Sequence, residues 1–234
     1  MTIVQPSGAV VVGASGGLGG ALVEALSRDG GFAWVEGLSR RGMPRLDLTD
    51  EASIAAAAEH VAARGEVGLV IVATGLLHGP DVQPEKTWRS LDAASLLAAY
   101  QVNAVGPALV AKHFLPLLPR RGRAVFAALS ARVGSIEDNR AGGWYAYRAS
   151  KAALNMLLRT LAIELRRSRP DAVLVGLHPG TVDTALSRPF QGNVAEGRLF
   201  APGLAAERLL GVIAGLTPAE SGQLYAWDGA RIPF

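Results

Sequence analysis

The sequence predicts an α/β fold in which helices wind around both sides of a parallel sheet of about seven strands. Short apolar runs alternate with longer helical stretches, the runs are apolar on both faces, and a glycine-rich turn follows the first run. Strands that are apolar on both faces belong to parallel sheets covered by helices on each side. Right-handed crossovers then predict a doubly wound sheet, formed as one domain over residues 1–234.

Seven apolar runs, bounded by glycine, proline or polar residues, are predicted as strands. Their ranges are 9–14, 32–39, 44–49, 67–74, 123–130, 172–179 and 222–229. The sequence contains no linker, internal repeat or low-complexity segment, which favours a single domain.

Helical patterns lie between the predicted strands. The first follows the glycine turn and ends at Gly30, and Asp50 is a good cap for an alanine-rich helix that ends near Arg64. The other predicted helices cover residues 90–118, with a kink at Pro107, residues 145–167 and residues 201–216. Residues 185–200 form the longest irregular stretch, which predicts a lid over a substrate site.

Composition excludes several classes of site. The chain has no cysteine, which excludes disulfides, thiolate ligands and a cysteine nucleophile and agrees with a cytoplasmic location. The four histidines are far apart in the chain, so no metal site is expected. No segment offers an uncharged apolar run of about 18 residues, so no membrane span is expected. The net charge of +3 comes from short, scattered arginine clusters, which favour solvated surfaces over a nucleic-acid interface.

The glycine turn "GASGGLGG" at residues 13–20 predicts a dinucleotide site. Glycine lets the backbone approach a phosphate closely, and the N-terminus of the following helix offers free N–H groups. The turn stands between the first strand and the first helix, which is the context that such a site requires.

The end of the second predicted strand indicates which dinucleotide is bound. Enzymes that use NAD usually carry a carboxylate there, which binds the ribose 2′-hydroxyl. This chain has Ser39 and Arg40 instead, and a guanidinium suits a 2′-phosphate. We therefore predict a preference for NADP(H), with NAD(H) as the possible alternative.

Tyr147 and Lys151 stand one helical turn apart, so both side chains project from the same face. An ammonium near a phenol favours the phenolate and lowers the tyrosine pKa from about 10. The compact lysine head can also bind a ribose hydroxyl. Together with the glycine turn, this pair predicts proton transfer beside a bound dinucleotide.

These residues resemble those of the short-chain dehydrogenases and reductases, along almost the whole chain. "GASGGLG" is similar to that family's G-x-x-x-G-x-G at Gly13, Gly17 and Gly19, and "YRASK" to its Tyr-x-x-x-Lys. The segments "GLLHG", "VGSI" and "WDGARIPF" resemble the C-factor-like carbonyl reductase branch. The resemblance implies a Rossmann fold and NAD(P)-dependent reduction of a carbonyl group.

The resemblance also implies roles for individual residues. Tyr147 would be the general acid, Lys151 would hold the ribose, and Asn103 would hold a water in a proton relay. Thr184 would contact the nicotinamide end, and Asp47 would lie beside the adenine. The implied cofactor site consists of Gly13, Ser15, Gly16, Gly17, Leu18, Gly19, Ser39, Arg40, Asp47, Leu48, Ala73, Thr74, Gly75, Asn103, Tyr147, Lys151, Pro179, Gly180, Val182 and Thr184.

Two departures from the family pattern matter. Val72, Ala73, Thr74 and Gly75 stand where the family usually has Asn-Asn-Ala-Gly, so the hydrogen bonds of those asparagines must be replaced or absent. The family's active serine position falls on Ala131, counted back from Gly134. We expect Ser130 to supply the active hydroxyl, with Ser135 as the alternative, and a longer loop before Tyr147.

The expected reaction is NADPH-dependent reduction of a ketone or aldehyde. Leu186, Phe190, Leu199 and Phe200 in the predicted lid suggest an apolar small-molecule substrate, whose identity the sequence does not reveal. The alternative is a regulatory or signalling protein that binds NADP(H) with little turnover. The helices at 90–118 and 145–167 resemble those that pair subunits in this family, which implies a homodimer or homotetramer, although their apolar stripes could equally be buried within one subunit.

Overall fold

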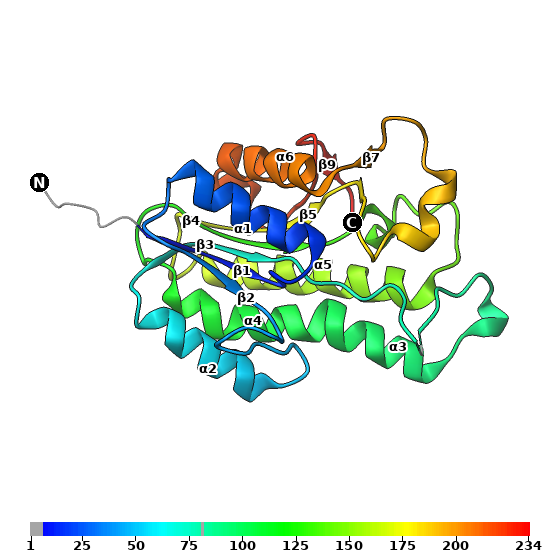
Figure 1. The fold of residues 1–234 in the computed structure, drawn as a ribbon, viewed down its shortest axis with the longest axis horizontal. Coiled ribbons are helices and arrows are strands. Elements are labelled where there is room, and N and C mark those ends of the chain that lie inside the picture. The colour runs from blue at the N-terminus through cyan, green and yellow to red at the C-terminus, as the bar shows by residue number, and fades with distance from the viewer. Residues whose placement is uncertain (1–6, 81) are drawn as a thin grey trace, which may run out of the picture.

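A seven-stranded sheet with helices on both faces forms the centre of the molecule, as the computed structural model shows over residues 7–80 and 82–234 (Figure 1). The strand order is β2-β1-β3-β4-β5-β8-β9, and only β9 runs antiparallel to its neighbour. The strands are β1 Gly8–Val12, β2 Val35–Leu38, β3 Val67–Val72, β4 Ala124–Leu129, β5 Ala172–His178, β8 Leu224–Ala226 and β9 Arg231–Ile232. A separate pair, β6 Thr181–Val182 and β7 Leu199–Phe200, brackets most of the predicted lid. The doubly wound sheet is confirmed.

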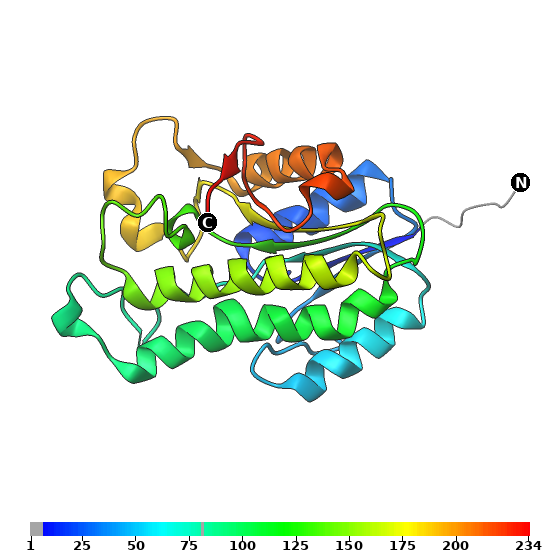
Figure 2. The ribbon, with the colours of Figure 1, turned by 180° about the vertical axis from the view of Figure 1, so that it is seen from behind.

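The helices cover the two faces of the sheet in two groups. Helices α1 (Gly17–Asp29) and α6 (Pro202–Gly215) lie on one face, and α2 (Glu51–Ala62), α4 (Gly106–Phe114) and α5 (Tyr145–Leu165) on the other (Figures 1 and 2). Each group has its own core, because alternate residues of each strand face opposite sides. In β1, for example, Val10 and Val12 belong to the core beneath α2, α4 and α5, whereas Ala9 and Val11 pack beneath α1 and α6.

The predicted strand at 44–49 is wrong. Its backbone makes only an isolated bridge, between Ser39 and Arg45. Side-chain hydrogen bonds compete with a strand ladder in this segment. Asp47 Oδ1 accepts from the backbone N–H of Thr49 at 3.0 Å, and Arg45 Nη2 donates to Asp47 Oδ2 at 2.7 Å. The predicted cap at Asp50 is confirmed, since its side chain accepts from the backbone N–H of Ser53.

The last predicted strand, 222–229, is shorter in the structure than the sequence predicts. It is strand β8 only over Leu224–Ala226, after which the chain turns at Gly229 and returns as the antiparallel β9. This hairpin supplies the seventh strand that the segment 44–49 does not provide.

The long helix predicted at 90–118 is interrupted. Helix α3 covers Ala93–Tyr100, a π-helical turn covers Gln101–Val105, and α4 follows. The interruption comes just before Pro107, which has no N–H for the carbonyl four residues earlier and whose ring clashes with it. The segment Ala93–Leu117 is long and apolar enough to cross a membrane by length and composition, but Phe114 is completely buried against the sheet.

Candidate active site

The glycine turn after β1 forms a cradle with no room for side chains. The N-cap of the 13-residue helix α1 is Gly16, which has no side chain. The first backbone N–H groups of the helix therefore receive no hydrogen bond acceptor from the N-cap residue. A Cβ on Gly19 would collide with the carbonyl oxygen of Gly13, and one on Gly17 would lie 2.9 Å from Thr184 Cγ2. Bare backbone at a helix N-terminus fits the diphosphate of a dinucleotide.

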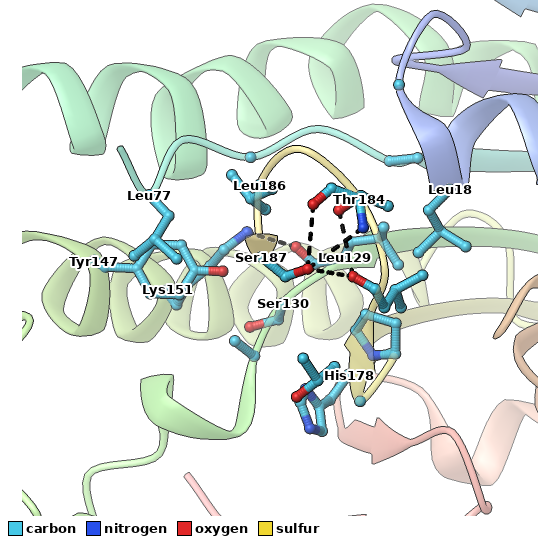
Figure 3. A pocket seen from close by; sticks show the side chains of 18 of the residues that line it. Leu18, Leu77, Leu129, Ser130, Tyr147, Lys151, His178, Thr184, Leu186 and Ser187 are labelled. Atoms are coloured by element: carbon cyan, nitrogen blue, oxygen red, sulfur yellow. Dashed lines mark hydrogen bonds between the residues drawn. The ribbon is translucent and has the colours of Figure 1, made fainter. Parts of the chain in front are cut away.

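A cavity of about 380 Å³ runs from this cradle to Tyr147 and Lys151 at the carboxyl edge of the sheet (Figure 3). The strands end here, and five separate chain segments meet around it, within residues 16–19, 73–77, 129–133, 144–151 and 178–194. The predicted cofactor residues that line it are Gly16, Gly17, Leu18, Gly19, Ala73, Thr74, Gly75, Tyr147, Lys151, Pro179, Gly180, Val182 and Thr184.

The other predicted cofactor residues lie outside this cavity. Gly13 lies beneath the turn, where a Cβ would meet Thr74, and Asn103 is buried behind Gly75. Ser15, Ser39, Arg40, Asp47 and Leu48 do not line it. Arg40 is exposed in the turn just after β2, at the neighbouring strand end. The pKa of Asp47 is lowered by the backbone N–H and hydroxyl of Thr49 and by Arg45, so this carboxylate is held in place by its own segment.

Tyr147 and Lys151 reach from the same face of α5 into the cavity (Figure 3). The Lys151 Nζ atom lies 5.8 Å from the centre of the tyrosine ring and donates to the carbonyl of Leu129 at 2.6 Å. Lys151 is only 2% exposed, and burial lowers its pKa to about 7. Burial raises the Tyr147 pKa to about 12.

The expectation that Lys151 lowers the Tyr147 pKa is therefore wrong for the protein alone. Desolvation disfavours both charged forms, the phenolate and the ammonium. The lysine is partly neutral at pH 7 and its hydrogen bond goes to Leu129 rather than to the phenol.

Asn103 lies in the π-helical turn and joins the end of β3 to α5. Its side chain accepts from the backbone N–H of Leu76 at 2.7 Å and donates to the Leu76 carbonyl at 2.8 Å and to Ser150 Oγ at 3.0 Å. Its amide is thus fully engaged by protein groups and braces this corner. Its backbone carbonyl would accept from residue 107 in a regular α-helix, and Pro107 has no N–H to give.

The two candidate serines are placed differently. Ser130 lines the cavity, whereas Ser135 does not and accepts from the backbone N–H of Asp138 at 3.0 Å. Ser130 Oγ donates to Asn155 Oδ1 at 2.7 Å, so its hydroxyl points toward α5. Ala131, at the family's usual serine position, also lines the cavity.

The end of β3 keeps one bracing hydrogen bond and lacks another. The Ala73 backbone N–H donates to Val12 at 2.7 Å, which holds β3 to β1. The Thr74 hydroxyl is buried without a partner in the described part of the chain. The aliphatic side chains of Val72 and Ala73, at the two asparagine positions, can make none of the expected hydrogen bonds, and the Thr74 hydroxyl beside them does not replace these.

The predicted lid closes one side of the cavity with aromatic contacts. His78 Nε2 lies 3.1 Å from the carbonyl of Ala185, and Phe190 packs edge-on against both His78 and Trp144. Leu186 and Phe190 line the cavity as expected, whereas Leu199 and Phe200 do not. The sequence did not predict Leu77, Trp144 and His178 as lining residues, although His178 directly precedes the predicted cofactor residues Pro179 and Gly180.

Trp144 enters α5 in a left-handed conformation, with φ of 53°. Such backbone is unfavourable for a bulky residue and persists where its surroundings hold it. The Trp144 N–H donates to the Glu85 carbonyl at 2.6 Å, and the Ala146 N–H donates to the buried Glu85 carboxylate. Glu85 therefore fixes the start of the helix that carries Tyr147 and Lys151.

Two relatives with known names are similar to this chain in sequence. The C-signal of Myxococcus xanthus is 37% identical over 145 residues, which cover 62% of this chain and 81% of the relative. The 1-hydroxy-2-glutathionyl-2-methyl-3-butene dehydrogenase of Rhodococcus sp. strain AD45 is 32% identical over 187 residues, 80% of this chain and 77% of the relative.

A solved structure shares the fold. The NADPH-bound carbonyl reductase from chicken fatty liver superposes with a TM-score of 0.83 at 25% identity, over 98% of this chain and 95% of that one. The family described as short chain dehydrogenase matches residues 39–194. With its glycine cradle and its Tyr147–Lys151 pair at the carboxyl edge of the sheet, the chain belongs to the short-chain dehydrogenase family.

Proposed function

We propose that this protein is an NADP(H)-dependent oxidoreductase that reduces a ketone or aldehyde to an alcohol. The observation that carries the proposal is one cavity that joins the glycine cradle to Tyr147 and Lys151. The names of two relatives, an NADPH-bound carbonyl reductase and a dehydrogenase, support the same reaction class.

The cradle at residues 13–19 would hold the diphosphate, and Arg40 would pair with the 2′-phosphate. A reduced nicotinamide bound at the Pro179–Thr184 end would supply the hydride. The chain's own part is to hold the carbonyl and move a proton.

Tyr147 lines the cavity with its phenol protonated at neutral pH, and it donates that proton to the carbonyl oxygen. Ser130 orients that oxygen, for which its hydroxyl must turn away from Asn155. Lys151 remains beside the tyrosine and holds a ribose hydroxyl. The Asn103 carbonyl, left without its helical partner, would hold the water that returns a proton through Lys151.

The substrate side of the cavity is apolar. Leu77, Trp144, Leu186 and Phe190 line it, and the segment 185–200 is proposed as the lid. An uncharged, partly apolar group beside the carbonyl fits these walls.

A panel of ketones and aldehydes tests the proposal by loss of NADPH absorbance. Turnover of at least one compound, abolished by Tyr147→Phe, is the expected result. The second candidate is an NADP(H)-binding signalling protein, which the name of the M. xanthus relative and the engaged Ser130 hydroxyl favour. Tight NADPH binding with no oxidation across the panel would select that candidate.

We also propose that the protein forms homodimers or homotetramers. Leu97 on α3 and Met156 and Ile163 on α5 are 71%, 67% and 54% exposed. Large apolar side chains gathered on neighbouring helices mark a surface for another copy. Light scattering that gives a mass near 24 kDa would contradict this.

A further inference from the structure

A second, smaller cavity lies beside the main one, at the same edge of the sheet. Its volume is about 210 Å³, and Arg132, His178, Gly180 and Thr181 line both cavities. We call it the arginine cavity, because Arg132 and Arg198 stand among its lining residues, together with His178, Thr181, Trp227 and Asp228. Its walls come from four separate segments, each of which follows or belongs to a strand.

The charges of the arginine cavity favour an anion. Two guanidinium groups and one carboxylate, Asp228, line it. Asp138, which pairs with Arg132, and Arg208, which lies behind the wall, offset each other, so the whole group keeps one net positive charge. Arg132 is paired with Asp138 at 2.9 Å, and Asp228 already accepts from the Ala230 N–H at 3.1 Å. Arg198 makes no side-chain hydrogen bond or ion pair within residues 7–80 and 82–234.

Two further groups support this reading. His178 lines the cavity as a neutral ring, since burial lowers its pKa to about 4. Its Nδ1 atom is buried and has no partner in the described part of the chain. Arg208 adds a positive charge behind the wall, where its guanidinium lies 4.4 Å from the Phe200 ring and 4.3 Å from the Trp227 ring.

The walls are formed before any ligand arrives. Phe200 and Trp227 pack edge-on with ring centres 4.8 Å apart. They approach Gly180 so closely that a Cβ there would lie 2.7 Å from Phe200, and its φ of 76° also requires glycine. The Glu137 N–H donates to the Phe234 carbonyl oxygen at 3.1 Å, which ties the loop after Arg132 to the segment that follows β9.

We propose that the arginine cavity binds a carboxylate carried by the carbonyl substrate, so that the preferred substrates are oxo acids. The proposal rests on the proposed function, because the carbonyl must reach Tyr147 through the shared wall while the carboxylate lies between Arg198 and Arg132. A single net positive charge matches a monoanion, and guanidinium groups bind carboxylates with paired hydrogen bonds.

Matched substrates test the proposal. The pairs are 4-carboxybenzaldehyde with methyl 4-formylbenzoate, and succinic semialdehyde with butanal, each measured as kcat/KM with NADPH. In the wild type, at least one acid is expected to exceed its neutral partner. Arg198→Gln should lower kcat/KM for that acid on the order of 10- to 100-fold and change the neutral partner less than about twofold, which is the range for a hydrogen bond to a charged group.

Arg132→Gln should also lower kcat/KM for the acid more than for its neutral partner. The matched control is Arg231→Gln, an exposed arginine on β9 outside the cavity, which should leave both members of each pair unchanged. Equal kcat/KM for acid and neutral partner in the wild type, or equal losses for both in Arg198→Gln, would overturn the proposal.

A binding measurement separates this proposal from the proposed function. Ligand-observed NMR titration of 4-carboxybenzaldehyde onto protein saturated with NADP⁺ needs no turnover. If no aldehyde is reduced, weaker binding of the acid to Arg198→Gln than to wild type still supports the cavity. Reduction of neutral aldehydes without any difference in acid binding would sustain the enzyme and reject the anion site.

Discussion

The two ends of the main cavity are built in different ways. The cradle end is lined by one short segment, the turn at residues 16–19, and the exposed Arg40 lies outside the cavity at the neighbouring strand end. The reacting end joins residues 73–77, Ser130, α5 and the predicted lid. Lys151 is almost completely buried there, and Asn103 is buried behind Gly75. A locally built, exposed end should control affinity, whereas a buried end assembled from distant segments should control rate and stability.

The largest expected effect belongs to Tyr147→Phe. Loss of a general acid typically lowers rates by about 10²–10⁴-fold, so kcat should fall by roughly 10³-fold. NADPH affinity, measured by fluorescence titration, should change less than about twofold. The control is Tyr145→Phe, because Tyr145 lies two residues earlier on α5 and does not line the cavity. Near-normal turnover in Tyr147→Phe would contradict the claim that the reacting end of the cavity controls the rate.

Asn103→Ala should be the most destabilising of these changes. It removes three hydrogen bonds and leaves the partly buried N–H and carbonyl of Leu76 without their Asn103 partners, so the free energy of unfolding should fall by about 2–4 kcal/mol. Urea denaturation measures this. Gln101→Ala, in the same π-helical turn, should lose less than about 1 kcal/mol, because its long 3.5 Å contact to Leu48 is weak. Similar losses for both variants would mean that Asn103 is not a special brace.

Arg40→Asp tests whether the cradle end controls cofactor affinity and not the rate. A lost charged hydrogen bond is worth about 1.5–3 kcal/mol, so NADPH should bind roughly 10- to 100-fold more weakly, with NADH little changed. The saturating kcat should stay within about twofold. Arg41→Asp, at the adjacent exposed position, is the control for general charge effects. An equal loss of NADPH and NADH affinity would refute the 2′-phosphate assignment.

A further expected effect is a pH dependence of stability from Lys151. Its pKa is about 7 in the folded protein and about 10.5 when the chain is unfolded, so between these values the unfolded chain holds a proton that the folded chain has released. The buried charged form of Lys151 destabilises the folded protein, and this destabilisation is complete below pH 7. It disappears as pH rises from 7 to 10.5, so the free energy of unfolding increases over that range. Tyr147, raised to about 12, acts in the opposite direction above pH 10.

Unfolding of the cofactor-free protein between pH 7 and 9.5 measures the Lys151 effect. Lys151→Met should flatten the rise of stability with pH relative to the wild type. Lys86→Met, at an exposed lysine, should keep the wild-type slope. Parallel slopes in all three proteins would show that Lys151 keeps its proton in the folded state.

Features that depend on neighbouring residues could be predicted from the sequence. The glycine turn between β1 and α1, the Asp50 cap and the shared face of Tyr147 and Lys151 all follow from local backbone geometry and helical period. The prediction of a strand at 44–49 was wrong for a local reason too, because Thr49 donates hydrogen bonds to Asp47 within the same segment. The pattern of apolar residues gives no information about such side-chain hydrogen bonds.

Residue type and spacing therefore determined the fold class, the cradle and the reactive pair. Only the tertiary structure decided that Ser130 rather than Ser135 faces the cavity, that burial moves the pKa of Lys151 down and of Tyr147 up, and that Arg132 and Arg198 share a second cavity. The physical reason is distance along the chain: burial and the meeting of charges from four segments arise only when the carboxyl ends of the strands come together at one edge of the sheet.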